Sequence, residues 1–385
     1  MTRKLKMGMI GGGKNAFIGA IHRIAANMDG LVELHCGAFS SSPEISKESG
    51  KELFLRSSKS YNSYEEMITI ESQLPIAERM DFATIVTPNF AHFAPAMMAL
   101  DHGFHVLIDK PMTLTLDEAK QLQQKVKETG LVLCLTHTYS GYPMVKQARK
   151  MVSENALGKI RKIMVEYNQG WLSSSSEKEG NKQAIWRTDP SKSGVSGCMG
   201  DIGTHAAQLA EYISGLKITQ LCADINTVVE GRQLDDDGNV LLKFDNGANG
   251  ILVATQIATG EENGLKIKMY GEKGGLEWDQ MEPNSLIIKW LDKPMQVYRT
   301  GNSYLSTIAM ENTRTPSGHP EGYLEAFANL YKNFALTLSS LLEGKKPTAS
   351  MLDFPSVEDG VRGMAFIENV IASGKSDQKW FDFKI

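Results

Sequence analysis

Two polar residues four positions apart, Asp201 and His205, open an apolar helical pattern in the segment Asp201-Ile202-Gly203-Thr204-His205. Residues at this spacing share one face of a helix, so a carboxylate and an imidazole come together. A histidine near a helix N-terminus lies in a positive dipole, which keeps the imidazole neutral and able to accept a proton. The pair therefore fits general-base chemistry, with Asp201 orienting the ring. The structural alternative is that Asp201 caps the helix and His205 packs inside it.

A lysine at the end of an expected strand is a second candidate for chemistry. Asp109-Lys110-Pro111 follows the β-rich run 104–109. Proline biases the residue before it toward extended backbone, which projects Lys110 from the strand end. Ligands of open α/β sheets bind beyond the carboxyl ends of the strands. Lys110 can there hydrogen-bond a hydroxyl or polarise a carbonyl; the alternative is a surface lysine before a turn.

A glycine cluster near the start of the chain, Gly11-Gly12-Gly13-Lys14-Asn15-Ala16, has the pattern Gly-x-Gly-x-x-Ala between an apolar strand and a helical pattern. In a dinucleotide-binding turn, Gly11 allows the tight turn and Gly13 lets backbone N–H groups approach a pyrophosphate. The small Ala16 lets the helix pack closely on the strand, and the helix N-terminus faces the anion. The alternative is a glycine turn with no ligand.

These residues need a scaffold, and residues 1–140 indicate a doubly wound parallel sheet. Apolar strands alternate there with amphipathic helices, as in a Rossmann domain. A capping box, Thr115 with Glu118, marks the start of one helix. The strands expected after the first one are 31–38, 81–87, 104–109 and 131–136.

Residues 141–385 follow a different pattern, typical of an α+β domain with a large, mostly antiparallel open sheet. Asn239–Gln256 and Leu265–Trp278 each hold two apolar runs around a glycine-containing turn, which predicts hairpins. We expect this domain to bind substrate and to form a homodimer or homotetramer through an exposed sheet face. Helices expected to cover one face of the sheet are 143–156, 201–214, 321–343 and 355–373.

Composition excludes several classes of protein. The chain has 385 residues, a net charge of −4 and a pI near 6.1, so it offers no basic field for nucleic acid. No run approaches the ~20 apolar residues of a membrane span, and the first strand starts too close to Met1 for a signal segment, so we expect a cytoplasmic protein. The four cysteines form no Cys-x-x-Cys pair, which favours reduced thiols over zinc ligands or disulfides, and no metal is expected.

Four motifs in order resemble the glucose-fructose oxidoreductase / inositol dehydrogenase / MocA family along nearly the whole chain. They are the glycine turn, Thr-Pro-Asn-x-x-His at 87–92, Asp-Lys-Pro at 109–111 and Asp-x-Gly-x-His at 201–205. The family usually has Glu-Lys-Pro where this chain has Asp-Lys-Pro, a departure that keeps the lysine. By resemblance, Lys110, Asp201 and His205 correspond to the family's catalytic set. The resemblance implies an NAD(P)-dependent enzyme that moves a hydride between nicotinamide and a secondary ring hydroxyl.

Within that family, the stretches 13–19, 186–187 and 318–327 look most like levoglucosan dehydrogenase and glycoside 3-dehydrogenase members. This implies that the substrate is a pyranose, an anhydrosugar, a glycoside or a cyclic polyol, with C3 the favoured carbon. Two alternatives remain: a glycoside-cleaving enzyme that uses transient oxidation and elimination, and a sugar-sensing regulator without turnover. The regulator should lack the Lys–Asp–His set, which this chain has.

The cofactor is expected to be NAD or NADP. The second strand ends in Ala38-Phe39-Ser40-Ser41-Ser42, with no acid to hold a ribose 2′-hydroxyl and no arginine to hold a 2′-phosphate, and the resemblance favours NAD. The expected cofactor contacts are Gly11, Gly13, Asn15, Ala16, Phe17, Ile18, Ser40, Thr87, Pro88, Asn89, His92, Asp109 and Lys110. The expected substrate contacts are Lys110, Trp186, Arg187, Asp201, His205, Asn312, Arg314 and His319.

Overall fold

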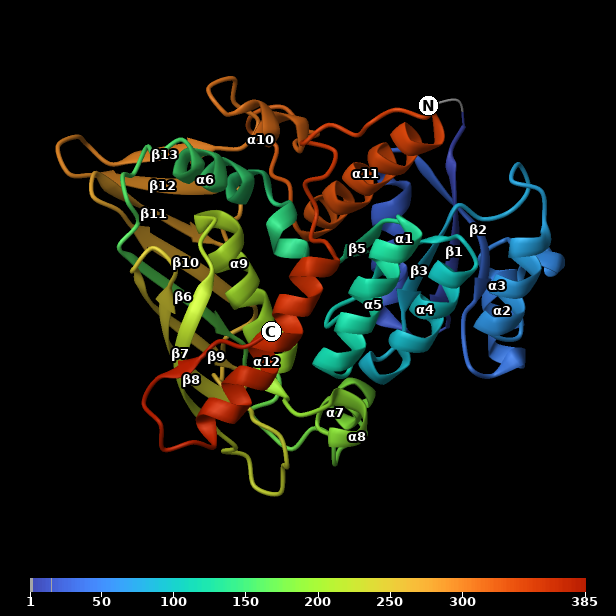
Figure 1. Ribbon diagram of the computed structural model, residues 1–385, viewed down its shortest axis with the longest axis horizontal. Coiled ribbons are helices and arrows are strands. Elements are labelled where there is room, and N and C mark those ends of the chain that lie inside the picture. The colour runs from blue at the N-terminus through green and yellow to red at the C-terminus, as the bar shows by residue number, and fades with distance from the viewer. Residues whose placement is uncertain (1–2, 15) are drawn as a thin grey trace. The chain divides into compact units, whose positions relative to one another are not determined.

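A computed structural model of the chain describes residues 3–14 and 16–385. The chain forms two compact units (Figure 1). The first consists of Met1–Thr138 and Phe327–Val361, and the second of Tyr139–Ala326 and Arg362–Ile385. The first break lies close to the boundary expected after residue 140. The return of the chain to the first unit at Phe327 is not part of that expectation.

The first unit contains the expected Rossmann sheet. Its five strands are all parallel and lie in the order β2-β1-β3-β4-β5. Every residue of β3 is buried, as expected for a parallel strand in a sheet covered on both faces. The strands are β1 (Leu5–Gly11), β2 (Val32–Ala38), β3 (Phe82–Val86), β4 (His105–Ile108) and β5 (Leu133–Leu135).

One helix of this unit, α5, begins where the local sequence predicts. The predicted capping box is present at the start of α5, where Thr115 and Glu118 each accept a hydrogen bond from the other's backbone N–H. Gly130 ends the same helix with a left-handed φ of +67°. The helices are α1 (Phe17–Met28), α2 (Pro43–Glu52), α3 (Tyr64–Gln73), α4 (Phe93–Asp101) and α5 (Leu116–Thr129), with short 3₁₀ turns at Ser57–Lys59 and Asn89–Ala91.

A late segment of the chain completes this unit. Most of α11 (Tyr323–Leu342) belongs to it, where the ring of Phe334 packs edge-to-face on Phe82 of β3, with 5.2 Å between centroids. Tyr331 of α11 hydrogen-bonds to Nδ1 of His22 in α1 at 2.8 Å. The expectation that helix 321–343 covers the antiparallel sheet therefore differs from the structure, because these aromatic side chains pack on the parallel sheet instead.

The second unit is built on a nine-stranded sheet in the order β13-β12-β11-β10-β6-β9-β8-β7-β14. All neighbours are antiparallel except β6 and β9, which run parallel. The hairpins expected from the sequence are confirmed as β8–β9 and β10–β11. The strands are β6 (Lys162–Asn168), β7 (Ile218–Asn226), β8 (Asp237–Phe244), β9 (Asn249–Thr255), β10 (Gly264–Tyr270), β11 (Gly274–Asp279), β12 (Ser285–Trp290), β13 (Gln296–Arg299) and β14 (Phe381–Asp382).

One face of this sheet carries the core of the second unit. Ile163, Val165 and Leu252 point to it and are buried, and α6 and α9 pack there (Figure 1). Among the described residues, no helix is both long and apolar enough to cross a membrane. The helices are α6 (Pro143–Ser153), α7 (Lys182–Arg187), α8 (Pro190–Ser193), a π-helix (Met199–Gly203), α9 (Thr204–Ser214), α10 (Thr307–Glu311) and α12 (Val357–Gly374), whose first residues belong to the first unit.

Three histidines of the first unit, His22, His92 and His137, are fully buried. Burial disfavours a charged imidazole, which lowers the pKa of His22 to about 4 and that of His137 to about 3, and also lowers the pKa of His92. All three rings are therefore neutral in the folded protein at neutral pH.

We expect the free energy of unfolding to decrease as the pH falls from about 7.5 to 5.5. In the unfolded chain these imidazoles take up protons near pH ~6.5, whereas the folded chain keeps them neutral, so acid favours the unfolded state. Below that pH, His22 and His137 each contribute about 1.4 kcal/mol of lost stability per pH unit, until the pH reaches their pKa in the folded protein. Urea unfolding across this range measures the effect. A stability that stays constant or rises on acidification contradicts it.

Candidate functional site

The glycine turn after β1 has the geometry that a dinucleotide requires. Gly11 and Gly12 adopt left-handed φ angles of +81° and +70°, which glycine reaches at little cost. A Cβ on Gly13 would lie 2.7 Å from Ser49 Oγ and 2.8 Å from the Phe39 carbonyl oxygen, so no larger residue fits. Glycine is thus required at these positions by the backbone conformation of the turn and by its packing against Phe39 and Ser49, as the motif implies.

Helix α1 packs closely on this turn through Gly19. A Cβ there would lie 2.3 Å from both the Cα and the carbonyl oxygen of Gly12. The sequence analysis gave this packing role to Ala16, but Ala16 is the N-cap residue of α1. The small residue that sets the helix–strand distance is therefore Gly19, which lies outside the Gly-x-Gly-x-x-Ala pattern.

Backbone hydrogen bonds join the turn to the segment after β2. The Gly13 N–H donates to the Phe39 carbonyl at 3.2 Å. That other N–H groups of the turn bind a pyrophosphate stays a prediction. Among the described residues, no side chain caps α1 and no acid lies in its first turn, which suits an anion at this N-terminus. Asn15 lies outside the described residues. Phe17 is exposed, Ile18 is half-buried, and the Ser40 hydroxyl accepts a hydrogen bond from the Ser42 N–H.

Beyond β3, the turn 87–92 is held mainly by its own polar groups. Thr87 Oγ1 donates to the Ala91 carbonyl, and Pro88 and Asn89 lie between them. The ring nitrogens of His92 lie 2.8 Å from the Thr87 carbonyl and 2.9 Å from that of Pro111, and the neutral ring donates to one of them. His92 therefore connects the residues that follow β3 and β4.

Lys110 lies two residues after the end of β4, at the carboxyl edge of the parallel sheet. The Asp109 carboxylate accepts hydrogen bonds from the Lys110 N–H at 2.9 Å and from Thr136 Oγ1, just after β5, at 2.7 Å. The Lys110–Pro111 peptide is cis. Asp109 thus fixes the backbone that presents the lysine, at the edge where ligands of α/β sheets bind.

In the second unit, Asp201 lies inside the π-helix Met199–Gly203, which continues directly into α9. The alternative in which Asp201 caps the helix is therefore wrong, since the helix begins before it, after Cys198. The dipole argument for His205 also fails, because the effect falls off within the first turn and His205 lies further in. π-helical turns occur frequently at functional sites.

Arg187 and Gln256 both contact the Asp201 carboxylate. Arg187 Nε lies 3.2 Å from Asp201 Oδ2, and Gln256 Nε2 donates to the same oxygen at 2.9 Å. The Arg187 guanidinium also lies over two indole rings, 4.1 Å from the centroid of Trp186 and 5.8 Å from that of Trp171. Arg187 and Trp186, expected near the substrate, are thus grouped with Asp201.

A partly buried polar network extends from Asp201 toward His205. Gln256 is bonded to Gln169, and Gln169 donates to Asn263 Oδ1 at 2.8 Å. Asn263 in turn donates to the Tyr139 hydroxyl, and the Tyr139 ring packs edge-on against the buried His205 ring, with 4.9 Å between centroids. Sequence reasoning missed Gln169, Gln256 and Asn263, because isolated amides at strand ends form no recognisable motif.

Asp235 holds the start of the helix that carries Asp201 and His205. Its buried carboxylate accepts hydrogen bonds from the Gly197 N–H at 2.8 Å and the Met199 N–H at 2.7 Å. Burial raises the pKa of this carboxyl group, although these bonds oppose the shift. Asp235 therefore performs the capping role that the sequence analysis considered for Asp201.

The remaining expected substrate residues lie in the segment between α10 and α11. Asn312 Nδ2 donates to the Ile308 carbonyl at 2.8 Å, and Arg314 Nη1 donates to the Glu325 carbonyl at 3.1 Å. His319 is exposed beside the Pro316 carbonyl. Each of these contacts is to a backbone carbonyl of α10, of α11 or of the segment between them. A role for the three side chains in binding substrate stays a prediction.

Known protein families match both the Rossmann part of the chain and the part that follows it. Residues 5–137 match an oxidoreductase family with an NAD-binding Rossmann fold, and residues 145–277 match the GFO/IDH/MocA C-terminal domain. The chain belongs to the GFO/IDH/MocA oxidoreductase family. Both the fold class and the NAD-binding domain expected from the sequence are thereby confirmed.

Several relatives of this GFO/IDH/MocA protein match over nearly their full length. An inositol dehydrogenase homologue from Azotobacter vinelandii, in complex with NAD⁺, is 32% identical, with a TM-score of 0.94 and coverage of 100% of this chain and 98% of that one. The same homologue has a structure with NADH and myo-inositol. An oxidoreductase from Sinorhizobium meliloti is 40% identical, with a TM-score of 0.89 and coverage of 98% and 99%. Levoglucosan dehydrogenase of Pseudarthrobacter phenanthrenivorans is 24% identical over 99% of this chain and 98% of its own.

We expect Gly19→Ala to weaken NAD⁺ binding by about tenfold or more. We also expect it to lower the free energy of unfolding by about 1–3 kcal/mol. The added methyl group would overlap Gly12 backbone, so α1 must move away from the turn. Calorimetric titration with NAD⁺ and thermal unfolding measure the two effects.

Asn27→Ala, on an exposed position near the far end of the same helix, is the matched control and should retain both properties. Unchanged NAD⁺ affinity in a folded Gly19→Ala protein would show that this contact does not set the cofactor turn.

Proposed function

We propose that this enzyme transfers a hydride between a nicotinamide cofactor and a secondary ring hydroxyl of a pyranose, anhydrosugar, glycoside or cyclic polyol, with C3 the favoured carbon of a pyranose. The observation that carries the proposal is the polar network of Asp201, Gln256, Gln169 and Asn263, which lies beside His205. Amides, a carboxylate and an imidazole supply the mixture of donors and acceptors that vicinal hydroxyls require. The relatives named for inositol and levoglucosan support the same substrate class.

The reaction follows from the roles of three residues. His205 accepts the proton of the reacting hydroxyl as a general base, which typically contributes ~10²–10⁴-fold in rate. Lys110 stabilises the negative charge that develops on that oxygen. Asp201, kept in place by Arg187 and Gln256, orients the base and the sugar. A bound nicotinamide cofactor, which the glycine turn Gly11–Gly13 would hold, would supply the hydride acceptor.

The environment of Arg187 argues against a 2-hydroxy acid as substrate. Such an acid needs an arginine that pairs with its carboxylate through two parallel hydrogen bonds. Arg187 instead hydrogen-bonds Asp201 and Gln183, with Trp186 against its guanidinium. Arg187 therefore acts as a positioning group for Asp201.

We expect NADH formation with one or more of levoglucosan, glucose, methyl glucosides and myo-inositol. Activity only with lactate-like or malate-like acids would contradict the proposal. Product analysis should find a ketone at a ring carbon. Absorbance at the NADH band and mass spectrometry of the product measure both. Release of a free sugar from a glycoside without net NADH would favour the elimination mechanism instead.

Three variants test the assigned roles on whichever substrate is active. Lys110→Ala and His205→Ala should lower kcat by about 10²-fold or more and leave NAD⁺ affinity nearly unchanged. Asp201→Asn should do less damage, since it keeps an acceptor oxygen for Arg187 and Gln256. Wild-type turnover in His205→Ala would leave that residue a structural histidine.

We also propose that the outer face of the nine-stranded sheet joins two copies of this chain. Leu241, Ile251 and Met164 are direct cross-strand neighbours on β8, β9 and β6. They point away from the covered face, and Leu241 and Met164 are 43% and 40% exposed. A self-complementary apolar patch of this kind suits the isologous interface of a twofold dimer.

Replacing Met164 and Leu241 together by glutamate should convert the oligomer to a monomer, because two buried charges on each copy would face each other across the interface. Light scattering after size-exclusion chromatography measures the mass. Ile76→Glu, at a similarly exposed apolar position of the first unit, is the control and should keep the wild-type mass. A wild-type monomer at micromolar concentration would contradict this assignment.

A further inference from the structure

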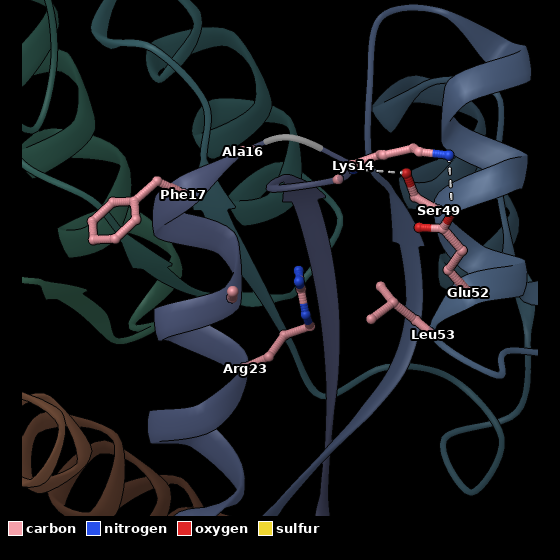
Figure 2. A pocket seen from close by; sticks show the side chains of 9 residues that line it. Lys14, Ala16, Phe17, Arg23, Ser49, Glu52 and Leu53 are labelled. Carbon is pink, nitrogen blue, oxygen red and sulfur yellow. Dashed lines mark hydrogen bonds and ion pairs between the residues drawn. The ribbon is translucent and has the colours of Figure 1, made fainter.

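Lys14, the residue after Gly13 in the cofactor turn, is bound to two carboxylates of α2. Its Nζ lies 2.7 Å from Glu48 Oε1 and 3.0 Å from Glu52 Oε1. Figure 2 shows the lysine reaching from the turn to Glu52, and both partners raise its pKa. A cation inside a phosphate-binding turn is thus already neutralised by groups of the chain itself.

The position of Lys14 relates it to one end of the cofactor. The Gly13 N–H donates to the Phe39 carbonyl, and the Lys14 N–H donates to Ser49 Oγ at 3.0 Å. Lys14 therefore lies against the segment that follows β2, where a Rossmann fold holds the adenosine ribose. NAD and NADP differ there by one group, a 2′-hydroxyl in the first and a 2′-phosphate in the second.

The charges around this segment favour the hydroxyl. A third carboxylate, Glu44, accepts a hydrogen bond from the Ser42 hydroxyl at the start of α2. A doubly charged phosphate placed among Glu44, Glu48 and Glu52 would be repelled, and Lys14, paired with two of them, would not compensate. The neutral 2′-hydroxyl of NAD is not repelled by these carboxylates.

Arg23 is another cation near the turn, and it bonds to backbone rather than to a carboxylate. Arg23 Nη1 donates to the Gly12 carbonyl at 2.7 Å, below the turn (Figure 2). A cavity of about 480 Å³ separates this part of α1 from α2 and is lined by Lys14, Arg23, Glu52 and Leu53 among others. The cavity leaves the Lys14 side chain space to turn if its two partners are removed.

We propose that Glu48 and Glu52 determine cofactor choice: they hold Lys14 and exclude a 2′-phosphate, so the enzyme selects NAD over NADP although its second strand lacks the usual acidic residue. Lys14 is accordingly a latent phosphate ligand, suppressed by its ion pairs. The inference rests on the dinucleotide binding of the proposed function but not on the identity of the sugar. It is therefore tested by binding alone.

The test is the affinity of the full-length protein for NAD⁺ and for NADP⁺, measured by calorimetric titration at low salt. Wild type should bind NAD⁺ at least about tenfold more tightly than NADP⁺. Glu48→Gln with Glu52→Gln should strengthen NADP⁺ binding by about tenfold or more and change NAD⁺ binding by less than about threefold. The gain should shrink as salt is added, because it comes from exposed charges.

Two further variants make the outcome specific. Adding Lys14→Gln to the double variant should remove the NADP⁺ gain, since no released cation remains. Asp101→Asn breaks a comparable exposed ion pair, with Lys125 at 2.7 Å, at the far end of α4, and should leave both affinities unchanged. Circular dichroism confirms that each variant is folded.

The results that overturn the proposal are distinct from those that overturn the proposed function. An unchanged NADP⁺-to-NAD⁺ ratio in the folded double variant, or a gain that persists without Lys14, refutes the role of the glutamates while leaving the dehydrogenase intact. A wild type that prefers NADP⁺ refutes it as well. Failure of wild type to bind either dinucleotide would overturn both this inference and the proposed reaction.

Discussion

The near-contact of the Gly12 and Gly19 backbones is the constraint on which the first unit depends. Because neither residue has a Cβ, α1 begins directly beside the β1 turn, and its N-terminus lies where a dinucleotide needs it. The same placement brings His22, three residues after Gly19 on the helix, against Tyr331 and Phe327. One close approach therefore sets both the cofactor turn and the position of α11.

Most of the fold could be predicted from the sequence because its elements carry strong local signals. Buried parallel strands, the capping box at Thr115 and the glycine hairpins are patterns within short windows, and each appears at the expected residues. The return of Phe327–Val361 to the first unit could not be predicted in this way. An apolar helix face shows that a helix is buried, but not which sheet buries it.

The candidate site was likewise predictable only in part. The motif residues Lys110, Asp201 and His205 are recognisable from their spacing. The groups that hold Asp201 are Arg187 at the end of α7, 14 residues earlier, and Gln256 just after β9, 55 residues later, and no local pattern links them to it. The π-helix was also hidden, since an extra residue in a turn leaves no compositional trace. The role of Glu48 and Glu52 toward Lys14 likewise depends on a helix meeting a loop more than 30 residues earlier. Long-range polar pairing is thus the part that a single sequence conceals.

The two-segment composition of the first unit has a consequence for how the protein is made. A ribosome that has produced residues 1–138 must still add the whole span up to residue 361 before the second segment can join. At about 5–20 residues per second this takes roughly ten to forty-five seconds. Throughout that interval the apolar side chains that later meet α11, among them Phe82, lack their partner. Nascent chains of this protein therefore pass through a defined period of exposure to aggregation, and chaperones that act during synthesis have a window in which to bind them.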